Sequence, residues 1–348
     1  MSLPSIRRIA EAVGVSKSAV SLALRNDRSI SAVTRDKIHA AAAKMGYKLN
    51  PLVAALMAQQ RTGRAAENSP VIAFIDYYGA PADPGRHKGG GKLGSEATEH
   101  LQRTADLMFK AAGELGYQLD YLKARDAGMT PERLAGILAA RGVRGIIFLR
   151  PRDISEPWQD MWLGHCAVEL GGSGKSHHQV RLNQLATMRQ LLHELSARGY
   201  RRPGLAMQGG YDYPGGFQRL AFMEYYDGKP ASQRVKSFWA ERWNREVFLD
   251  WWKSEKPDVV VGTDLAPLHW LREAGVDVPG ETGFACSDWL PRYRTEAAGM
   301  DGRHDIRILS AVRVLDGLLR HNERGLPEVP LSTTLCGEWV DGPSVRAR

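Results

Sequence analysis

The sequence predicts an α/β protein made of two parts, a small helical head at the N-terminus and a larger body built on parallel β-sheets. Three helical patterns follow one another within residues 1–49. From Pro70 onward, short apolar segments alternate with helical patterns, which is typical of parallel sheets covered by helices on both faces. The chain has 348 residues, more than one hydrophobic core usually organises, so more than one packed unit is expected.

The excess positive charge of the protein is confined to the head. Of the 47 basic and 39 acidic residues, residues 1–64 hold eleven and three, which leaves 36 of each sign for the rest of the chain and a net charge of +8 overall. A basic head on a neutral body is the electrostatic pattern of a nucleic-acid binder. A short basic segment is in other proteins no more than a solvated face, so the charge alone leaves both interpretations open.

The composition indicates the cellular compartment and excludes some classes of protein. The three cysteines, Cys166, Cys286 and Cys336, are too few and too scattered for a disulfide framework or a metal knuckle, and they fit a reduced cytoplasmic setting. No apolar run approaches the roughly 18 residues that span a bilayer. The first residues, MSLPSIRRIAEAV, are charged where a secretory signal needs an apolar core. We therefore expect a cytoplasmic protein without a membrane partner.

Helix signals divide the head into three short helices. Ile6–Val13 has apolar residues at helical spacing and is stopped by Gly14, because glycine readily takes the left-handed conformation at a helix end. Ser16 is a good N-cap for a second helix that runs to about Leu24. Ser31 is expected to cap a third helix, which Gly46 closes.

The spacing of Ala10, Gly14 and Val20 predicts a helix-turn-helix. Small Ala10 allows the two helices to approach, Gly14 forms the corner, and Val20 seals the contact between them. Such a motif places its second helix in the major groove of DNA. Three small helices also occur as a plain structural bundle, but the concentrated positive charge favours DNA binding.

The head resembles the lac repressor (LacI/GalR) family of bacterial regulators. The segment IRRIAEAVGVSKSAVSLALRND is similar to the start of that family's head, and ISAVTRDKIHAAAAKMGYKLNP is similar to the remainder. The resemblance implies that Lys17, Ser18 and Leu22 read bases, and that Ser16, Ser21 and Arg25 contact phosphates or nearby bases. Leu22 stands where a polar residue is frequent, and it offers an apolar contact to a thymine methyl group.

A fourth short pattern, NPLVAALMAQQ, links the head to the body. Asn50 is a strong N-cap, and the proline after it suits the first helical position. One turn of apolar helix here can simply pack on the core. The family resemblance instead implies a hinge helix that orders on DNA and inserts Leu56 into the minor groove. We therefore expect a head over 1–49 and a hinge and linker over 50–69.

The body also resembles the family, whose core has the fold of periplasmic sugar-binding proteins, with two lobes joined by three crossovers. The segments VRLNQLATMRQLLHELSARGYRRPGLAM and VVVGTDLAPLHWLREAGVDVPGETGFACSD carry the resemblance. It implies that the chain crosses near residues 170, 295 and 328. The first lobe then comprises about 70–170 and 296–328, and the second about 171–295 and 329–348.

The resemblance also implies an effector site at the carboxyl ends of the strands. Arg219 matches the family arginine that clamps effector hydroxyls or a carboxylate, Glu169 lies where an acidic ligand is frequent, and Trp239 falls at a position that stacks on sugar rings. Thr263 replaces the usual asparagine before Asp264, and Ser287 replaces the first acid before Asp288. The full set is Tyr77, Glu169, Arg219, Trp239, Thr263, Asp264, Ser287 and Asp288.

These observations predict a homodimeric repressor that binds a pseudo-palindromic double-stranded DNA operator and responds to a small molecule, a sugar or sugar derivative. The chain end GEWVDGPSVRAR lacks the heptad repeat of tetrameric relatives. One alternative is an architectural DNA-binding dimer without an effector. Another is a sugar-processing enzyme with a DNA-binding head, although no GxSxG or GxGxxG motif follows a predicted strand. We expect neither catalysis nor a cofactor or metal.

Overall fold

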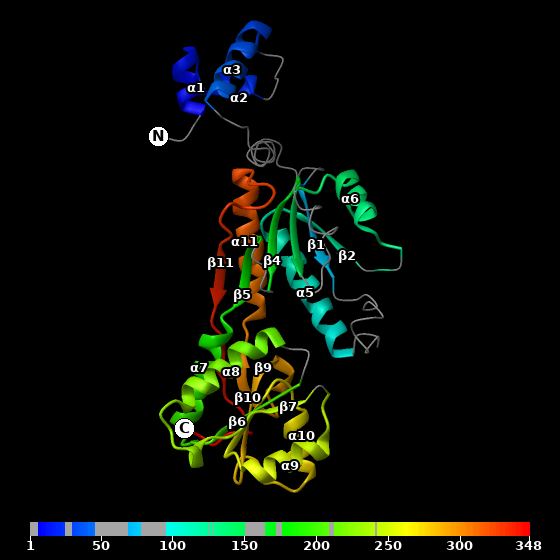
Figure 1. Ribbon diagram of the computed structural model, residues 1–348. Helices are drawn as coiled ribbons and strands as arrows, with labels where there is room; N and C mark the ends of the chain where they lie inside the picture. The colour runs from blue at the N-terminus through cyan, green and yellow to red at the C-terminus, as the bar shows by residue number, and fades with distance from the viewer. Residues whose placement is uncertain are drawn as a thin grey trace. The chain divides into compact units, whose positions relative to one another are not determined.

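The computed structural model divides into two compact units. One unit comprises Met1–Pro70 and Leu319–Asn322, and the other comprises Val71–Leu318 and Glu323–Arg348. The description covers residues 6–24, 30–45, 69–77, 95–124, 126, 128–149, 164–171, 176–208, 212–240 and 242–348. Helix and strand labels are those of Figure 1.

Three helices form the head: α1 (Ile6–Val13), α2 (Lys17–Ala23) and α3 (Ala32–Lys44). Their shared core consists of Ile9, Ala10, Val20, Ala23, Leu24, Ile38 and Ala42. The backbone N–H groups of Gly14 and Val15 both donate to the Ala10 carbonyl, at 2.9 and 3.0 Å, and Gly14 has a φ of 72°. The predicted turn and the predicted contact through Val20 are confirmed.

Serine caps begin two of these helices. The hydroxyl of Ser16 accepts the N–H of Ala19 at 3.1 Å, and the hydroxyl of Ser31 accepts the N–H of Thr34 at 3.3 Å. Both caps satisfy backbone donors that the first turn of a helix leaves without an intrahelical partner. The signals read from the sequence therefore set the starts of α2 and α3.

The first sheet of the body, called sheet A, is entirely parallel, with the strand order β11-β5-β4-β3-β1-β2. Its helices are α5 (Ser95–Glu114), α6 (Pro131–Ala140) and α11 (His304–His321). Its strands are β1 (Val71–Asp76), β2 (Gln118–Lys123), β3 (Gly145–Leu149), β4 (Cys166–Leu170), β5 (His178–Leu182) and β11 (Ser332–Leu335).

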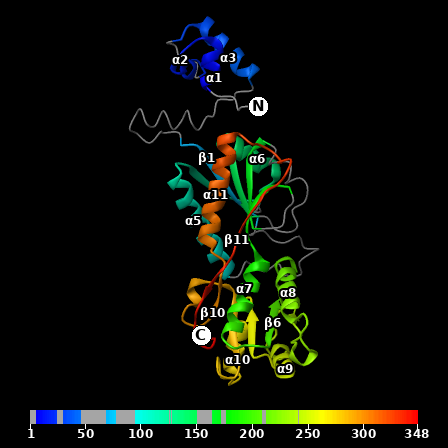
Figure 2. The same cartoon turned by 90° about the vertical axis from the view of Figure 1, so that its left-hand side faces the viewer.

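Helices cover sheet A on its two faces. Leu134 and Leu138 of α6 are fully buried against alternate residues of β1 and β3. The helices α5 and α11 lie side by side (Figures 1 and 2), because Tyr117, just after α5, donates to Asp316 at 2.8 Å and Thr104 is hydrogen-bonded to His304 at 2.7 Å. The predicted helices and apolar strands of this region are confirmed.

The second sheet of the body, sheet B, has the order β12-β10-β9-β8-β6-β7 and is parallel except for the antiparallel pair of β10 and β12. Its helices are α7 (Gln184–Ala197), α8 (Asp212–Tyr226), α9 (Arg245–Glu255) and α10 (Ala266–Glu273), with short 3-10 turns η3 (Ala231–Gln233) and η4 (Pro291–Tyr293). Its strands are β6 (Pro203–Gln208), β7 (Phe238–Ala240), β8 (Val259–Gly262), β9 (Gly283–Trp289), β10 (Ala298–Asp301) and β12 (Glu338–Val340).

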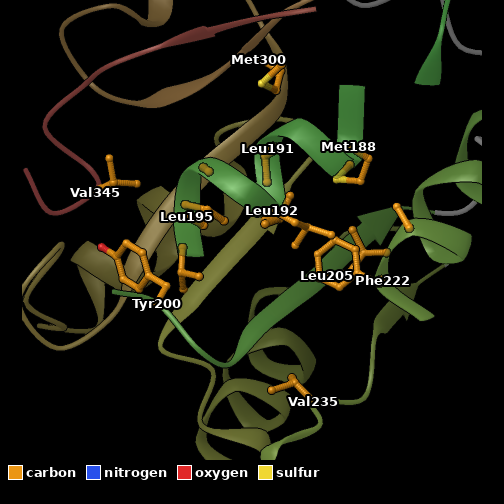
Figure 3. Packing of buried hydrophobic residues seen from close by; sticks show 14 of the residues in the cluster. Met188, Leu191, Leu192, Leu195, Tyr200, Leu205, Phe222, Val235, Met300 and Val345 are labelled. Atoms are coloured by element: carbon orange, nitrogen blue, oxygen red, sulfur yellow. The ribbon is translucent and has the colours of Figure 1, made fainter. Parts of the chain in front are cut away.

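Two separate cores define the two faces of sheet B. On the α7–α8 face, Leu191, Leu192 and Leu195 of α7 pack with Leu205 of β6 and Phe222 of α8, as Figure 3 shows. On the opposite, α9–α10 face, the core holds side chains of α9 and α10 and an aromatic group around Phe238, Phe248 and Trp270. Successive residues along a strand of sheet B therefore point alternately into the core of the α7–α8 face and into that of the α9–α10 face.

The crossovers differ from those expected near 170, 295 and 328. The chain changes sheet between β5 and β6, between β10 and β11, and between β11 and β12. The predicted lobe boundaries are therefore wrong for β5 and β11, which belong with the first lobe, and for β10, which belongs with the second. β5 is half polar and β11 is the exposed edge strand STTL, so neither carries the apolar signal that marked the other strands.

The predicted boundary between a head over 1–49 and a hinge over 50–69 lies outside the described residues, which resume at residue 69, and stays a prediction.

Candidate functional site

The second helix of the head presents its first residues outward. Val20 and Ala23 are completely buried in the head core, so α2 is held by one side. Ser16 and Lys17 are exposed and Leu22 is half-buried. Ser18 and Ser21 lie within α2, but their side chains fall outside the described part, as do Arg25, Asn50 and Leu56 altogether. The described head thus offers an exposed lysine directly after a capping serine.

Sheet A brings Tyr77 and Glu169 to one face near the carboxyl ends of its strands. Tyr77 directly follows β1 and packs in the same core as Ile75, whereas Glu169 of β4 lies opposite Phe148 of the same core. Ile75 of β1 is paired with Phe148 of β3, which is in turn paired with Glu169 of β4. Tyr77 and Glu169 therefore lie two strands apart in sheet A. Both side chains are almost fully buried, at 1 % and 0 % exposure.

The end of β1 also carries a buried carboxylate, Asp76. It accepts the phenolic O–H of Tyr121 at 3.1 Å. Burial raises the pKa of Tyr121 far above its ordinary value, and the negative charge of Asp76 raises that pKa further. Tyr121 therefore stays protonated and donates to Asp76 throughout the neutral range.

In sheet B, three of the predicted effector residues, Trp239, Thr263 and Ser287, lie in one row across the strands, called one level. Met207 is paired with Trp239, Ala206 with Gly262, and Gly262 with Cys286. Continued by one residue, this register sets Thr263 beside Met207 and Ser287 beside Thr263. Met207 packs into the core of the α7–α8 face, so the side chains on this level point to that face.

A local irregularity in β9 lies at this level. Cys286 is paired with Gly299 and Trp289 with Asp301, so Ser287 and Asp288 together stand opposite the single residue Met300. Such bulges re-aim side chains, and they recur next to functional sites. Ser287 is 7 % exposed, whereas Asp288 is exposed.

Three buried oxygens on the α7–α8 face have no hydrogen-bond partner within the described part of the chain: Thr263 Oγ1, Ser287 Oγ and Gln218 Oε1. Gln218 is 4 % exposed and lies on α8, three and four residues before Ala221 and Phe222, which pack in the same core. A buried polar atom without a partner costs about 1–3 kcal/mol. Native proteins keep few such groups, so three near one end of a sheet indicate a place for a ligand or ordered water.

Arg219 and Trp239 contact each other. The guanidinium carbon of Arg219 lies 5.8 Å from the centre of the Trp239 ring, a cation–π distance. Arg219 is exposed and Trp239 is 37 % exposed, so both retain accessible surface. The structure thus brings together the predicted clamp and the predicted stacking platform.

Asp264 is engaged with its own lobe. Its Oδ2 accepts the indole N–H of Trp243 at 2.7 Å, and its Oδ1 accepts the backbone N–H of Ala266 at 2.9 Å. Trp243 in turn is stacked on Phe238, with ring centres 6.1 Å apart and planes 4° apart. The acid therefore stiffens the turn after β8.

Sequence reasoning missed Gln218 and Arg307. Gln218 precedes Arg219 in a helix, and the only available signal was a polar residue on the apolar face. Arg307 lies on α11 and is coupled to β9 from a distant part of the sequence: burial lowers its pKa, while the negative charges of Asp288 and Asp301 oppose that shift. Its Nη2 lies 3.0 Å from Nδ1 of His304.

Within the described ranges, no cluster of His, Cys, Asp and Glu has an arrangement that would hold a metal ion. None of the described helices is long and apolar enough to cross a membrane.

Residues 5–50 match the family described as "Bacterial regulatory proteins, lacI family". Over these residues the head is similar to the lacI family. No curated protein matches the chain.

Solved structures of lacI-type proteins share the fold over nearly the whole chain. The lac repressor dimer bound to operator and the anti-inducer ONPF has a TM-score of 0.59 and 17 % identity, covering 99 % of this chain and 100 % of that one. The transcriptional regulator CelR in complex with cellobiose has a TM-score of 0.56 and 16 % identity, covering 98 % and 99 %. A lacI-family regulator from Silicibacter pomeroyi has a TM-score of 0.55 and 21 % identity, covering 99 % and 100 %.

These likenesses establish the fold, an α/β chain with a helix-turn-helix head similar to that of the lacI family and a two-lobed core of the periplasmic-binding type. The expected fold class is confirmed. The matched family and the similar structures are regulatory proteins rather than enzymes.

Proposed function

We propose that this protein is a transcriptional repressor that binds a pseudo-palindromic operator as a homodimer and is controlled by a small-molecule effector, a sugar or sugar derivative. The observation that carries the proposal is the lacI-family head, whose α2 exposes Lys17 directly after the Ser16 cap. The positive charge gathered in the same segment supports it, since phosphate contacts dominate the affinity of DNA binders.

Within the head, the predicted residues divide into two groups. Lys17, Ser18 and Leu22 read base edges in the major groove, and Ser16, Ser21 and Arg25 contact phosphates or nearby bases. Asn50 begins the hinge helix and Leu56 enters the minor groove. The exposure of Lys17 and the one-sided packing of α2 support this division.

In the body, the effector site comprises Tyr77, Glu169, Arg219, Trp239, Thr263, Asp264, Ser287 and Asp288. Tyr77 and Glu169 lie near the carboxyl ends of strands of sheet A, and Thr263 and Ser287 near those of sheet B. These positions support the proposal, because ligands of open parallel sheets bind at those ends. The cellobiose complex of CelR and the ligand-bound lac repressor support a small-molecule effector. The effector acts by binding one arrangement of the protein more tightly than another.

Selection of genomic DNA fragments by the full-length protein tests the proposal. We expect enrichment of one pseudo-palindromic motif, altered base preference for Lys17→Ala, and unchanged preference for Lys110→Ala, an exposed lysine of α5 in the body. The proposal is wrong if no motif is enriched, or if Lys17→Ala leaves every preference intact.

A further inference from the structure

The end of sheet B holds several groups whose hydrogen-bonding and charge-pairing capacity is unused. We propose that the effector is an anionic carbohydrate, whose carboxylate or phosphate pairs with Arg219 and whose hydroxyl groups bond to Gln218, Thr263 and Ser287. The proposal rests on the function proposed above, because it assigns a ligand class to the effector site of that regulator.

The three unpartnered oxygens indicate a hydroxyl-rich ligand. Thr263 and Ser287 lie on neighbouring strands at one level, and strands are about 4.8 Å apart. Gln218 faces the same side of the sheet from α8. A serine or threonine hydroxyl both donates and accepts, whereas an amide oxygen only accepts. A sugar hydroxyl can do both, so adjacent hydroxyl groups on a ring fit this set, whereas an apolar ligand would leave all three oxygens unpaired.

Arg219 supplies the positive charge for an anion. It makes no ion pair within the described part of the chain, although it lies over the ring of Trp239. The planar guanidinium presents parallel donors that match a carboxylate or a phosphate. The exposed part of Trp239 lies beside it and offers an aromatic surface to the apolar face of a sugar ring.

The two acids beside these residues in sheet B, Asp264 and Asp288, already interact with protein groups. Both oxygens of Asp264 accept hydrogen bonds from protein groups. Asp288 is close enough to Arg307 to oppose the lowering of that arginine's pKa. By the family resemblance, Ser287 and Thr263 stand where an acid and an amide are usual. Among the described residues at this end of sheet B, Arg219 thus keeps a positive charge without an ion-pair partner.

Thermal unfolding of the full-length protein tests the ligand class. The probes are D-glucuronate, D-galacturonate and D-glucose 6-phosphate, each compared with D-glucose or D-galactose at equal concentration. We expect at least one anionic probe to raise the unfolding temperature while its neutral counterpart does not, since a ligand that binds the folded state stabilises by mass action. Comparing the uronates with the phosphate shows which anionic group fits.

Two variants connect the effect to the site. Arg219→Gln should weaken the anionic probe about tenfold or more by titration calorimetry, because a charge-assisted hydrogen bond is lost, without altering unfolding in the absence of ligand. Arg245→Gln is the matched control, since it lies on the α9–α10 face and pairs with Glu273. Ser287→Ala should leave the ligand-free protein as stable or more stable, because an unpaired buried hydroxyl is removed, yet weaken binding severalfold.

Outcomes for the ligand and for the proposed function can be told apart by measuring DNA binding in the same preparations. If operator binding is intact and neutral sugars stabilise as strongly as anionic ones, or if no anionic probe stabilises, the ligand class is wrong. Equal weakening by Arg219→Gln and Arg245→Gln would overturn it as well. Loss of DNA selection would instead contradict the proposed function.

Discussion

The indole N–H of Trp243 donates to Oδ2 of Asp264 at 2.7 Å and so joins the strand-end region after β7 to the turn after β8. The other oxygen of Asp264 accepts the N–H of Ala266 at the start of α10. Trp243 is also packed edge to face on Trp270 of α10, with ring centres 5.7 Å apart. One carboxylate thus couples a helix start to the aromatic core of the α9–α10 face.

Asp264→Ala should reduce the free energy of unfolding by about 2 kcal/mol, because it removes a helix-start acceptor and the partner of a half-buried indole. Asp264→Asn keeps one carbonyl oxygen and should lose about half as much. Urea unfolding, followed by the fluorescence of the second lobe, measures the loss in both variants. Equal losses for the two variants would show that the hydrogen bonds do not determine the effect.

Leu191→Ala should reduce the free energy of unfolding by about 3 kcal/mol, since Leu191 is completely buried between α7 and sheet B (Figure 3) and its truncation leaves a cavity. Leu220→Ala on α8 is the matched control, because Leu220 is 41 % exposed, and it should change stability by less than about 0.5 kcal/mol. Chemical denaturation followed by circular dichroism compares them. Similar losses at both positions would contradict the packing described for this face.

Ser31→Ala should destabilise the head by about 1 kcal/mol, because the N–H of Thr34 loses its acceptor at the start of α3. Ser31→Asn preserves a capping oxygen and should restore most of the loss. Amide hydrogen exchange in the first turn of α3 is the measurement. Unchanged exchange in Ser31→Ala would show that the hydroxyl does not act as the cap.

Cysteine labelling should separate the three thiols. Cys166 and Cys286 are buried and Cys336 is exposed. Burial raises the pKa of Cys166 to about 11 and raises that of Cys286 as well, so both thiols stay protonated at pH 8. Iodoacetamide at pH 8 should therefore modify Cys336 first, since the thiolate is the nucleophile.

The raised pKa of Cys166 also makes the stability of the folded protein depend on pH. The folded protein holds the proton of Cys166 more tightly than the unfolded chain, whose thiol has its ordinary pKa near 9. The resulting stabilisation is fully present below about pH 9 and is lost as the pH rises through about 11. Cys166→Ala should therefore show a smaller fall in unfolding temperature between these pH values than the parent protein. An equal fall would assign the effect to other groups.

The elements of the head followed from local chemistry. Gly14, Ser16 and Ser31 each act within a few residues of their own position, so the turn and the two caps could be read directly from the sequence. The continuous apolar strands of the body were equally clear. The polar edge strand β11 was not, because its place in sheet A is set by pairing with β5 across about 150 residues of chain.

The candidate effector residues show the same difference between what the sequence indicates and what the tertiary structure decides. The family resemblance selected Arg219, Trp239, Thr263 and Ser287 one at a time, without indicating which of them meet. The register of β7, β6, β8 and β9 sets three of them on one level, and α8 brings Arg219 over Trp239. Gln218 joined the set only through its burial, because a glutamine in a helical pattern carries no signal of its own.

The sequence by itself determined that a basic helix-turn-helix head precedes a body of parallel sheets, since helix caps, turn glycines and apolar periodicity are local properties of the chain. Tertiary structure alone decided where the chain passes between the sheets and which polar groups are left without partners. Hydrogen bonds such as that of Trp243 to Asp264, and their absence at Ser287, depend on residues that are distant in sequence and adjacent only after folding.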